Sequence, residues 1–123
     1  MASEYDLMAK RPKKVPAFFF QTASGAEPVR EWLKDLDDKD RRVIGEDIAT
    51  VEYGWPVGMP ICRPLGDGLW EVRSSLPSRR EARIIFSIIE EQMVLLHGFI
   101  KKTQKTPKAE LDLALKRLKD IKE

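Results

Sequence analysis

LWEVR (69–73), ARIIFSIIE (82–90) and QMVLLHGFI (92–100) are three apolar runs that follow one another closely along the chain and decide its fold. Each run is rich in the β-branched, aromatic and aliphatic residues that favour strands. The charged residues at 90–91 leave room only for a tight turn, so the second and third runs should pair as a hairpin. The link between the first and second runs is longer. We therefore predict a three-stranded antiparallel meander.

Cations stand near the margins of this predicted sheet. Side chains alternate between the two faces of a strand, which places Arg83 on the same face as Ile85 and Ser87. Both faces of that run are apolar, so we expect a central strand with Arg83 at its first position, where the guanidinium can reach water or a ligand. His97 lies near the end of the third run, which leads directly into the basic segment KKTQKTP (101–107).

The rest of the chain predicts one further strand and three helices. We expect a short first strand around residues 17–21, covered on both sides because three consecutive phenylalanines cannot share one face. Apolar residues at helical spacing then predict a pair of helices that covers one face of the sheet. A glycine- and proline-rich connection follows at 55–68, and Thr106 and Pro107 mark the start of a closing helix. The order β-α-α-β-β-β-α predicts an α+β fold.

Length and composition limit what the chain can be. With 123 residues we expect a single domain over 17–123, preceded by a flexible basic arm at 1–16. The chain has no apolar run long enough to span a membrane and no signal-peptide pattern, so we expect a cytoplasmic protein. Cys62 and His97 are the single cysteine and histidine, which excludes an internal disulfide and a zinc site of the usual nitrogen and sulfur ligands. Composition alone leaves a carboxylate site for magnesium open.

Five segments, in this order and spacing, resemble the HigB-like, phage-derived branch of the RelE/ParE toxin superfamily. The resemblance covers about residues 17–122, and its most specific parts are GLWEVR and HGFIKKTQKTP. The segments are PVREWLKDL, RPLGDGLWEVRSSLP, ARIIFSI, LLHGFIKKTQKTP and ELDLALKRLKD.

The resemblance implies a RelE-like fold and the toxin of a type II toxin–antitoxin pair. Relatives of this kind cleave mRNA on the ribosome and are silenced by an antitoxin, often one with a helix-turn-helix domain. Ribosome, mRNA and antitoxin are therefore the expected partners, with neither membrane, metal nor cofactor. Oligomeric state is not predicted.

Metal-free cleavage of RNA uses the 2′-hydroxyl of the substrate as nucleophile, and needs a proton acceptor and cations around the phosphate. Arg73 and Arg83 occupy the positions of the family's phosphate-binding arginines, and Lys101 and Lys102 match its lysine pair after the last strand. His97 is the only side chain that ordinarily titrates near neutral pH. We expect catalytic roles for Arg73, Arg83, His97 and Lys102, and RNA contacts from Arg63, Lys101 and Lys105.

Several alternatives remain open at this stage. The two strand arginines could instead pair with Glu71, Glu81 or Glu90, and His97 could be a half-buried structural residue. The identity of the general base is not settled. At the level of function, the chain could be a ParE-like inhibitor of a protein such as DNA gyrase, or an inert phage-derived binding module.

Overall fold

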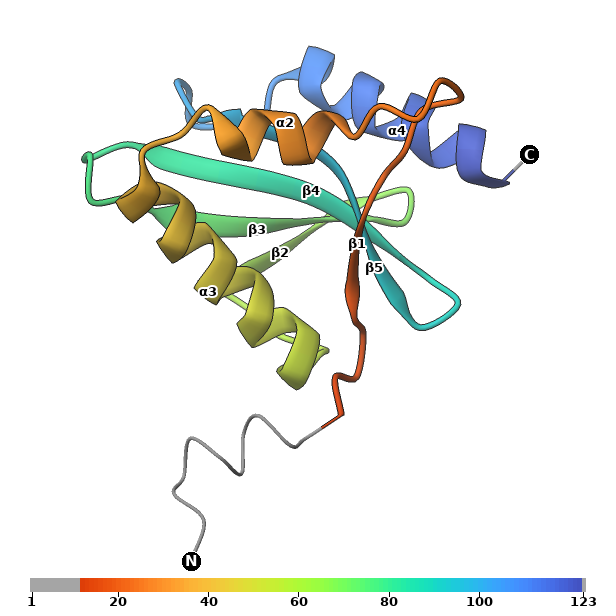
Figure 1. Cartoon of the computed structure of the whole chain (residues 1–123), viewed down its shortest axis with the longest axis horizontal. Helices are drawn as coiled ribbons and strands as arrows, with labels where there is room; N and C mark the ends of the chain where they lie inside the picture. The colour runs from red at the N-terminus through yellow and green to blue at the C-terminus, as the bar shows by residue number, and fades with distance from the viewer. Residues whose placement is uncertain (1–11, 123) are drawn as a thin grey trace, which may run out of the picture.

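The computed structural model describes residues 12–122, which form a five-stranded sheet with helices on both faces (Figure 1). The strand order across the sheet is β1-β5-β4-β3-β2. The elements in chain order are β1 (Ala17–Phe19), α2 (Pro28–Lys34), α3 (Asp38–Gly54), β2 (Cys62–Gly66), β3 (Leu69–Ser75), β4 (Glu81–Ile89), β5 (Gln92–Ile100) and α4 (Lys108–Lys122). This arrangement confirms the α+β architecture expected from the RelE-like resemblance.

The predicted meander is present as β3, β4 and β5, which pair antiparallel in sequence order. Glu90 and Glu91 make the tight turn of the β4–β5 hairpin, and both have positive φ angles, as turns of this kind require. The register shifts once, because Ile85 lies opposite His97 whereas its neighbour Phe86 lies opposite Leu95. Leu96 is thus the extra residue of a β-bulge, and the bulge keeps the side chains on both sides of it aligned with their faces of the sheet.

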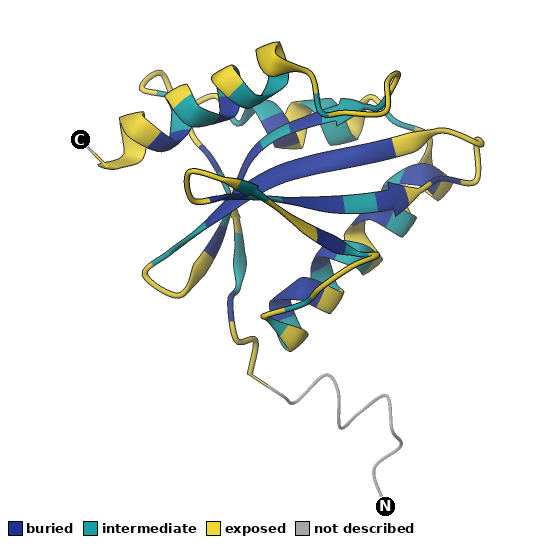
Figure 2. Ribbon diagram, turned by 180° about the vertical axis from the view of Figure 1, so that it is seen from behind, coloured by how far each residue is buried: buried dark blue, intermediate teal, exposed yellow. Residues whose placement is uncertain are grey.

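The helices divide between the two faces of the sheet. Apolar residues of α2 and α3 pack with one face, and those of α4 pack with the other. The predicted helical pair therefore covers one face, as expected. Buried residues run along most of β4, which confirms it as a strand covered on both sides (Figure 2).

Two predictions about strands were wrong. The segment 55–68, expected to be a connection, contains β2, which pairs antiparallel with β3. A strand is possible there because β2 lies at the edge of the sheet, where Pro64 has no ladder hydrogen bond to donate. The first strand, expected to be covered on both sides, lies at the opposite edge, and Phe18 is 49% exposed.

The described start of the chain packs against the end of α3. The backbone amides of Lys14 and Val15 both donate to the Glu52 carbonyl, and Val15 is buried. Residues 1–11 of the predicted arm lie outside the described residues. Among the helices of the described chain, none has the length and apolar character needed to cross a membrane.

Candidate functional site

Three of the cations predicted from the sequence, Arg63, Arg73 and Arg83, lie on the sheet face that α4 covers only in part. Arg73 of β3 stands directly opposite Arg83 of β4, and Arg83 stands opposite Phe99 of β5. In the neighbouring row, Arg63 of β2 lies opposite Glu71 of β3. Apolar residues of α4 pack over the other end of this face. The end of the face that carries the arginines is therefore not covered by α4, and a ligand could bind there.

These side chains surround a small hollow, which we call the cation hollow. Four of its residues are cations and one is an acid, and three different strands and the segment after β5 contribute them. Its free volume is about 10 Å³, which is about the space of a single water molecule. The hollow is lined by Arg63, Glu71, Arg73, Arg83, Phe99, Lys101, Gln104 and Thr106.

Glu71 is the acid of the cation hollow and is only 1% exposed. Its Oε2 accepts a hydrogen bond of 2.9 Å from the Thr106 hydroxyl, and its Oε1 lies 3.8 Å from Arg83 Nε. The prediction that Thr106 caps the closing helix was wrong, because its hydroxyl is directed to this carboxylate instead. The helix begins at Lys108, where the Leu111 amide donates to the Pro107 carbonyl.

Arg83 lies deeper than its position in the sequence predicted. We expected its guanidinium at the margin of the sheet, in reach of water, but the residue is only 4% exposed. The carboxylates of Glu71 and Glu81 lie 3.8 and 3.6 Å from the guanidinium and hold it within the sheet face. Burial lowers the pKa of Arg83, and the neighbouring Arg73 lowers it further, while Glu71 and Glu81 oppose the shift. The guanidinium remains a cation, held between two carboxylates and facing a second guanidinium.

Arg73 is half-buried and incompletely paired. Its Nε is buried and has no hydrogen-bond partner within residues 12–122, and its Nη1 lies 3.5 Å from the sulfur of Met59. A buried donor without a partner is costly, and like charges directly opposite each other on a sheet are destabilising. An anion bound between Arg73 and Arg83 would relieve both costs.

His97 belongs to the contact between β5 and α4 and does not line the cation hollow. Its Nε2 lies 2.6 Å from Glu110 Oε2, and its Nδ1 lies 3.5 Å from Arg117 Nη1. A guanidinium can only donate, so Nδ1 is the acceptor and Nε2 carries the proton shared with Glu110. Both ring nitrogens are thus engaged with α4, and Phe99 stacks on the ring at 5.7 Å between centroids.

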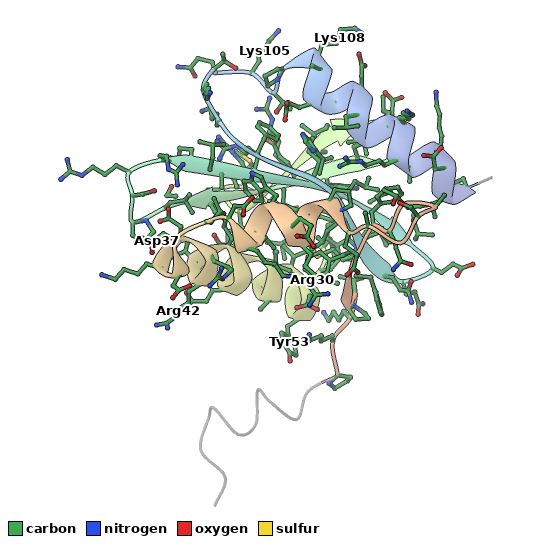
Figure 3. All side chains as sticks on the ribbon, turned by 45° about the horizontal axis from the view of Figure 1, so that its top comes forward. Arg30, Asp37, Arg42, Tyr53, Lys105 and Lys108 are labelled. Carbon is green, nitrogen blue, oxygen red and sulfur yellow. The ribbon has the colours of Figure 1, made fainter. Side chains whose placement is uncertain are left out.

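Lys102 and Lys105 also lie outside the lining of the cation hollow. Both are exposed on the segment between β5 and α4, and Lys105 extends outward from the molecule (Figure 3). Of the seven residues singled out from the sequence, the structure therefore brings together Arg63, Arg73, Arg83 and Lys101.

The sequence reasoning named Glu71 only as a possible partner of the strand arginines, a pairing that its 3.8 Å approach to Arg83 confirms, and it placed Thr106 at a helix cap. It did not predict that both line this hollow. Alternation along β3 could have found Glu71, since it shares a face with Arg73 two residues later. No local pattern could have placed Thr106, because its contact with Glu71 joins residues 35 positions apart.

A comparison with protein families finds one matching family model. The model of the family described as phage derived protein Gp49-like matches residues 31–119, from within α2 to within α4. A search of curated proteins finds no match. The matched range is most of the chain and includes every residue of the cation hollow. The chain accordingly belongs to the phage-derived Gp49-like family.

Proposed function

We propose that this protein is the toxin of a type II toxin–antitoxin pair of the RelE/ParE type and acts as an mRNA endoribonuclease on the ribosome. The observation that carries the proposal is the convergence of four cations on one hollow with a carboxylate inside it. Cations that gather from three strands and a following segment, around an acid too buried to be a surface charge, fit a phosphate whose ester is to be broken.

In the proposed reaction, the scissile phosphate rests at the mouth of the cation hollow, because the hollow itself has room for little more than one water molecule. Arg73, Arg83 and Lys101 hold the phosphate oxygens and stabilise the charge that grows on them. Arg63 contacts the neighbouring backbone. This geometry supplies the positive charge at the phosphate from side chains.

Glu71 is the general base of the proposed mechanism. The 2′-hydroxyl of the preceding ribose loses its proton to the carboxylate through one water molecule in the hollow, a route that general bases commonly use. Its oxygen forms a bond to phosphorus, the bond from phosphorus to the 5′-oxygen breaks, and the departing oxygen takes a proton from Lys101 or water. The products are a 2′,3′-cyclic phosphate and a free 5′-hydroxyl. His97 then acts by holding α4 against β5 rather than by proton transfer.

A reconstituted translation reaction with a defined mRNA tests this proposal. Wild-type protein should cut the transcript only when ribosomes are present. Glu71→Gln keeps the shape of the side chain but cannot accept the proton, so the cleavage rate should fall about 10²- to 10⁴-fold. Arg73→Gln should lower it by about 10²- to 10³-fold. Arg42→Gln is the matched control, since Arg42 is exposed on α3, across the molecule from Lys105 (Figure 3), and it should cut normally.

Other outcomes would contradict the proposal. Intact transcripts together with DNA damage in cells would favour a gyrase inhibitor, and unchanged growth after induction would favour a binding module. Full cleavage by a folded Glu71→Gln protein would show that Glu71 is not the general base. The proposed antitoxin is a small helix-turn-helix protein, for which the neighbouring gene is the first place to look.

A further inference from the structure

A second hollow lies on the other side of the arginine pair. We call it the base hollow. It has a volume of about 240 Å³, against about 10 Å³ for the cation hollow. The two hollows share Arg73 and Arg83. A nucleic acid chain with a phosphate at the cation hollow would therefore place the adjoining nucleoside at the base hollow. The base hollow is lined by Pro60, Ile61, Arg73, Ser75, Glu81 and Arg83.

The walls of the base hollow suit a flat aromatic ring. Pro60 and Ile61 supply apolar surface from the segment that enters β2, and Arg73 supplies a guanidinium plane. Unpaired bases are commonly held by stacking on apolar, aromatic or guanidinium groups, while their edges are recognised by hydrogen bonds.

Glu81 is the polar group that could recognise such an edge. The Ser75 hydroxyl donates to both of its carboxylate oxygens, at 3.1 and 3.0 Å, and Arg83 Nη1 lies 3.6 Å from Oε2. These contacts fix the carboxylate at the hollow. An ionised carboxylate has about four lone-pair positions, so acceptor capacity remains for a ligand.

We propose that the base hollow binds guanine and that Glu81 selects it. Guanine presents two adjacent donors on its Watson–Crick edge, N1–H and the N2 amino group, which match the two oxygens of a carboxylate. Adenine and cytosine present one amino group beside an acceptor nitrogen, and uracil presents one N–H between two carbonyls, so each would direct a lone pair at Glu81. This inference rests on the proposed function and adds its substrate preference.

The first test maps the cut sites by sequencing the new 5′ ends in many transcripts. Wild-type protein should show guanine enriched at one fixed position next to the cut. A bidentate pair contributes roughly 1–3 kcal/mol of discrimination, so Glu81→Gln should reduce this enrichment by about tenfold or more. The matched control is Glu46→Gln, an exposed glutamate of α3, which should keep it. Cuts without guanine enrichment, or enrichment that Glu81→Gln leaves intact, would overturn the inference.

A second measurement does not depend on cleavage. Guanosine 3′-monophosphate and uridine 3′-monophosphate are titrated into the folded proteins and followed by NMR. Wild-type protein should bind the guanosine nucleotide at least about tenfold more tightly, and Glu81→Gln should bring the two affinities together. Equal affinities in the wild type would overturn the inference. If wild-type protein cuts nothing, the proposed function fails, and the titration still decides whether the base hollow selects guanine.

Discussion

Gly98 shows how a single residue sets the position of a helix. It lies toward the end of β5, and a Cβ atom built on it would stand 2.6 Å from Cε3 and 2.8 Å from Cζ3 of Trp32. The indole of α2 therefore packs directly on the backbone of β5. Gly98 is required for this close approach of helix and strand, and no other residue fits without movement.

We predict that Gly98→Ala lowers the free energy of unfolding by about 1–3 kcal/mol, since an added methyl group would displace a large ring in a packed core. The midpoint of urea unfolding, followed by circular dichroism, measures the change. Gly45→Ala is the matched control, because nothing lies within 4 Å of a Cβ there and the residue is inside α3. That substitution should raise stability by about 0.5–1 kcal/mol. Equal effects of the two substitutions would contradict the assigned contact.

At the scale of elements, α3 holds the far end of the β3–β4 hairpin. Asp40 is buried and accepts hydrogen bonds from the Ser78 amide at 3.1 Å and from Arg80 Nη2 at 3.2 Å. About two turns further along α3, Asp47 accepts a 2.7 Å hydrogen bond from the Ser74 hydroxyl. Ser74 is the neighbour of Arg73, so this helix helps to fix the strand that carries the arginine.

Asp40 should make this link sensitive to acid. Hydrogen bonding from Ser78 lowers the pKa of Asp40, and Arg80 adds to the effect against the opposing influence of burial. A lowered pKa in the folded state contributes stability that is present above the ordinary value of 3.8 and is lost as the pH falls below it. Wild-type protein should therefore be more stable than Asp40→Asn at pH 7, and the difference should shrink below about pH 4.

Urea unfolding of both proteins at pH 7, 5 and 3 measures this difference. Glu46→Gln serves as the control, since Glu46 is exposed on the same helix and its replacement should make little difference at any of these values. A gap between wild type and Asp40→Asn that stays the same at pH 3 would show that ionisation of Asp40 does not stabilise the fold.

Elements with a strong local pattern could be predicted from the sequence, and contacts between distant segments could not. The meander and the helical pair follow from strand and helix periodicity. β2 was missed because glycine and proline dominate its segment, and an edge strand tolerates both. The family resemblance singled out Arg73 and Arg83, but the register that sets them directly opposite each other depends on tertiary pairing. The burial of Arg83 and the role of Thr106 depend on it as well.

At the scale of the whole molecule, the net charge of +2 gives little sign of an anion-binding surface. Residues 17–62, which include the helices α2 and α3 of the opposite face, carry nine acidic residues against five Lys and Arg, whereas four cations gather at one hollow. Placement of charge, rather than its total, is what a polyanion would meet.

Binding of single-stranded nucleic acid should therefore weaken with salt. Each neutralised phosphate contributes about −0.7 to the slope of log affinity against log salt concentration. Arg63→Gln removes one cation of the hollow and should make the slope shallower by about 0.7. Fluorescence anisotropy with a short DNA strand, which lacks the 2′-hydroxyl and resists cutting, provides the measurement. Arg42→Gln should leave the slope unchanged, and a slope equally altered by both substitutions would indicate binding without a defined site.

The direct opposition of Arg73 and Arg83 has a consequence for the history of such a protein. Two guanidinium groups that stand opposite each other repel, which lowers the stability of the folded protein. An uncharged residue at either position would remove this repulsion. Selection for thermal stability alone should therefore favour substitution of one of the two arginines, as commonly happens where activity needs a destabilised site. We therefore expect both arginines to persist in those related sequences in which binding of an anion between them still contributes to function.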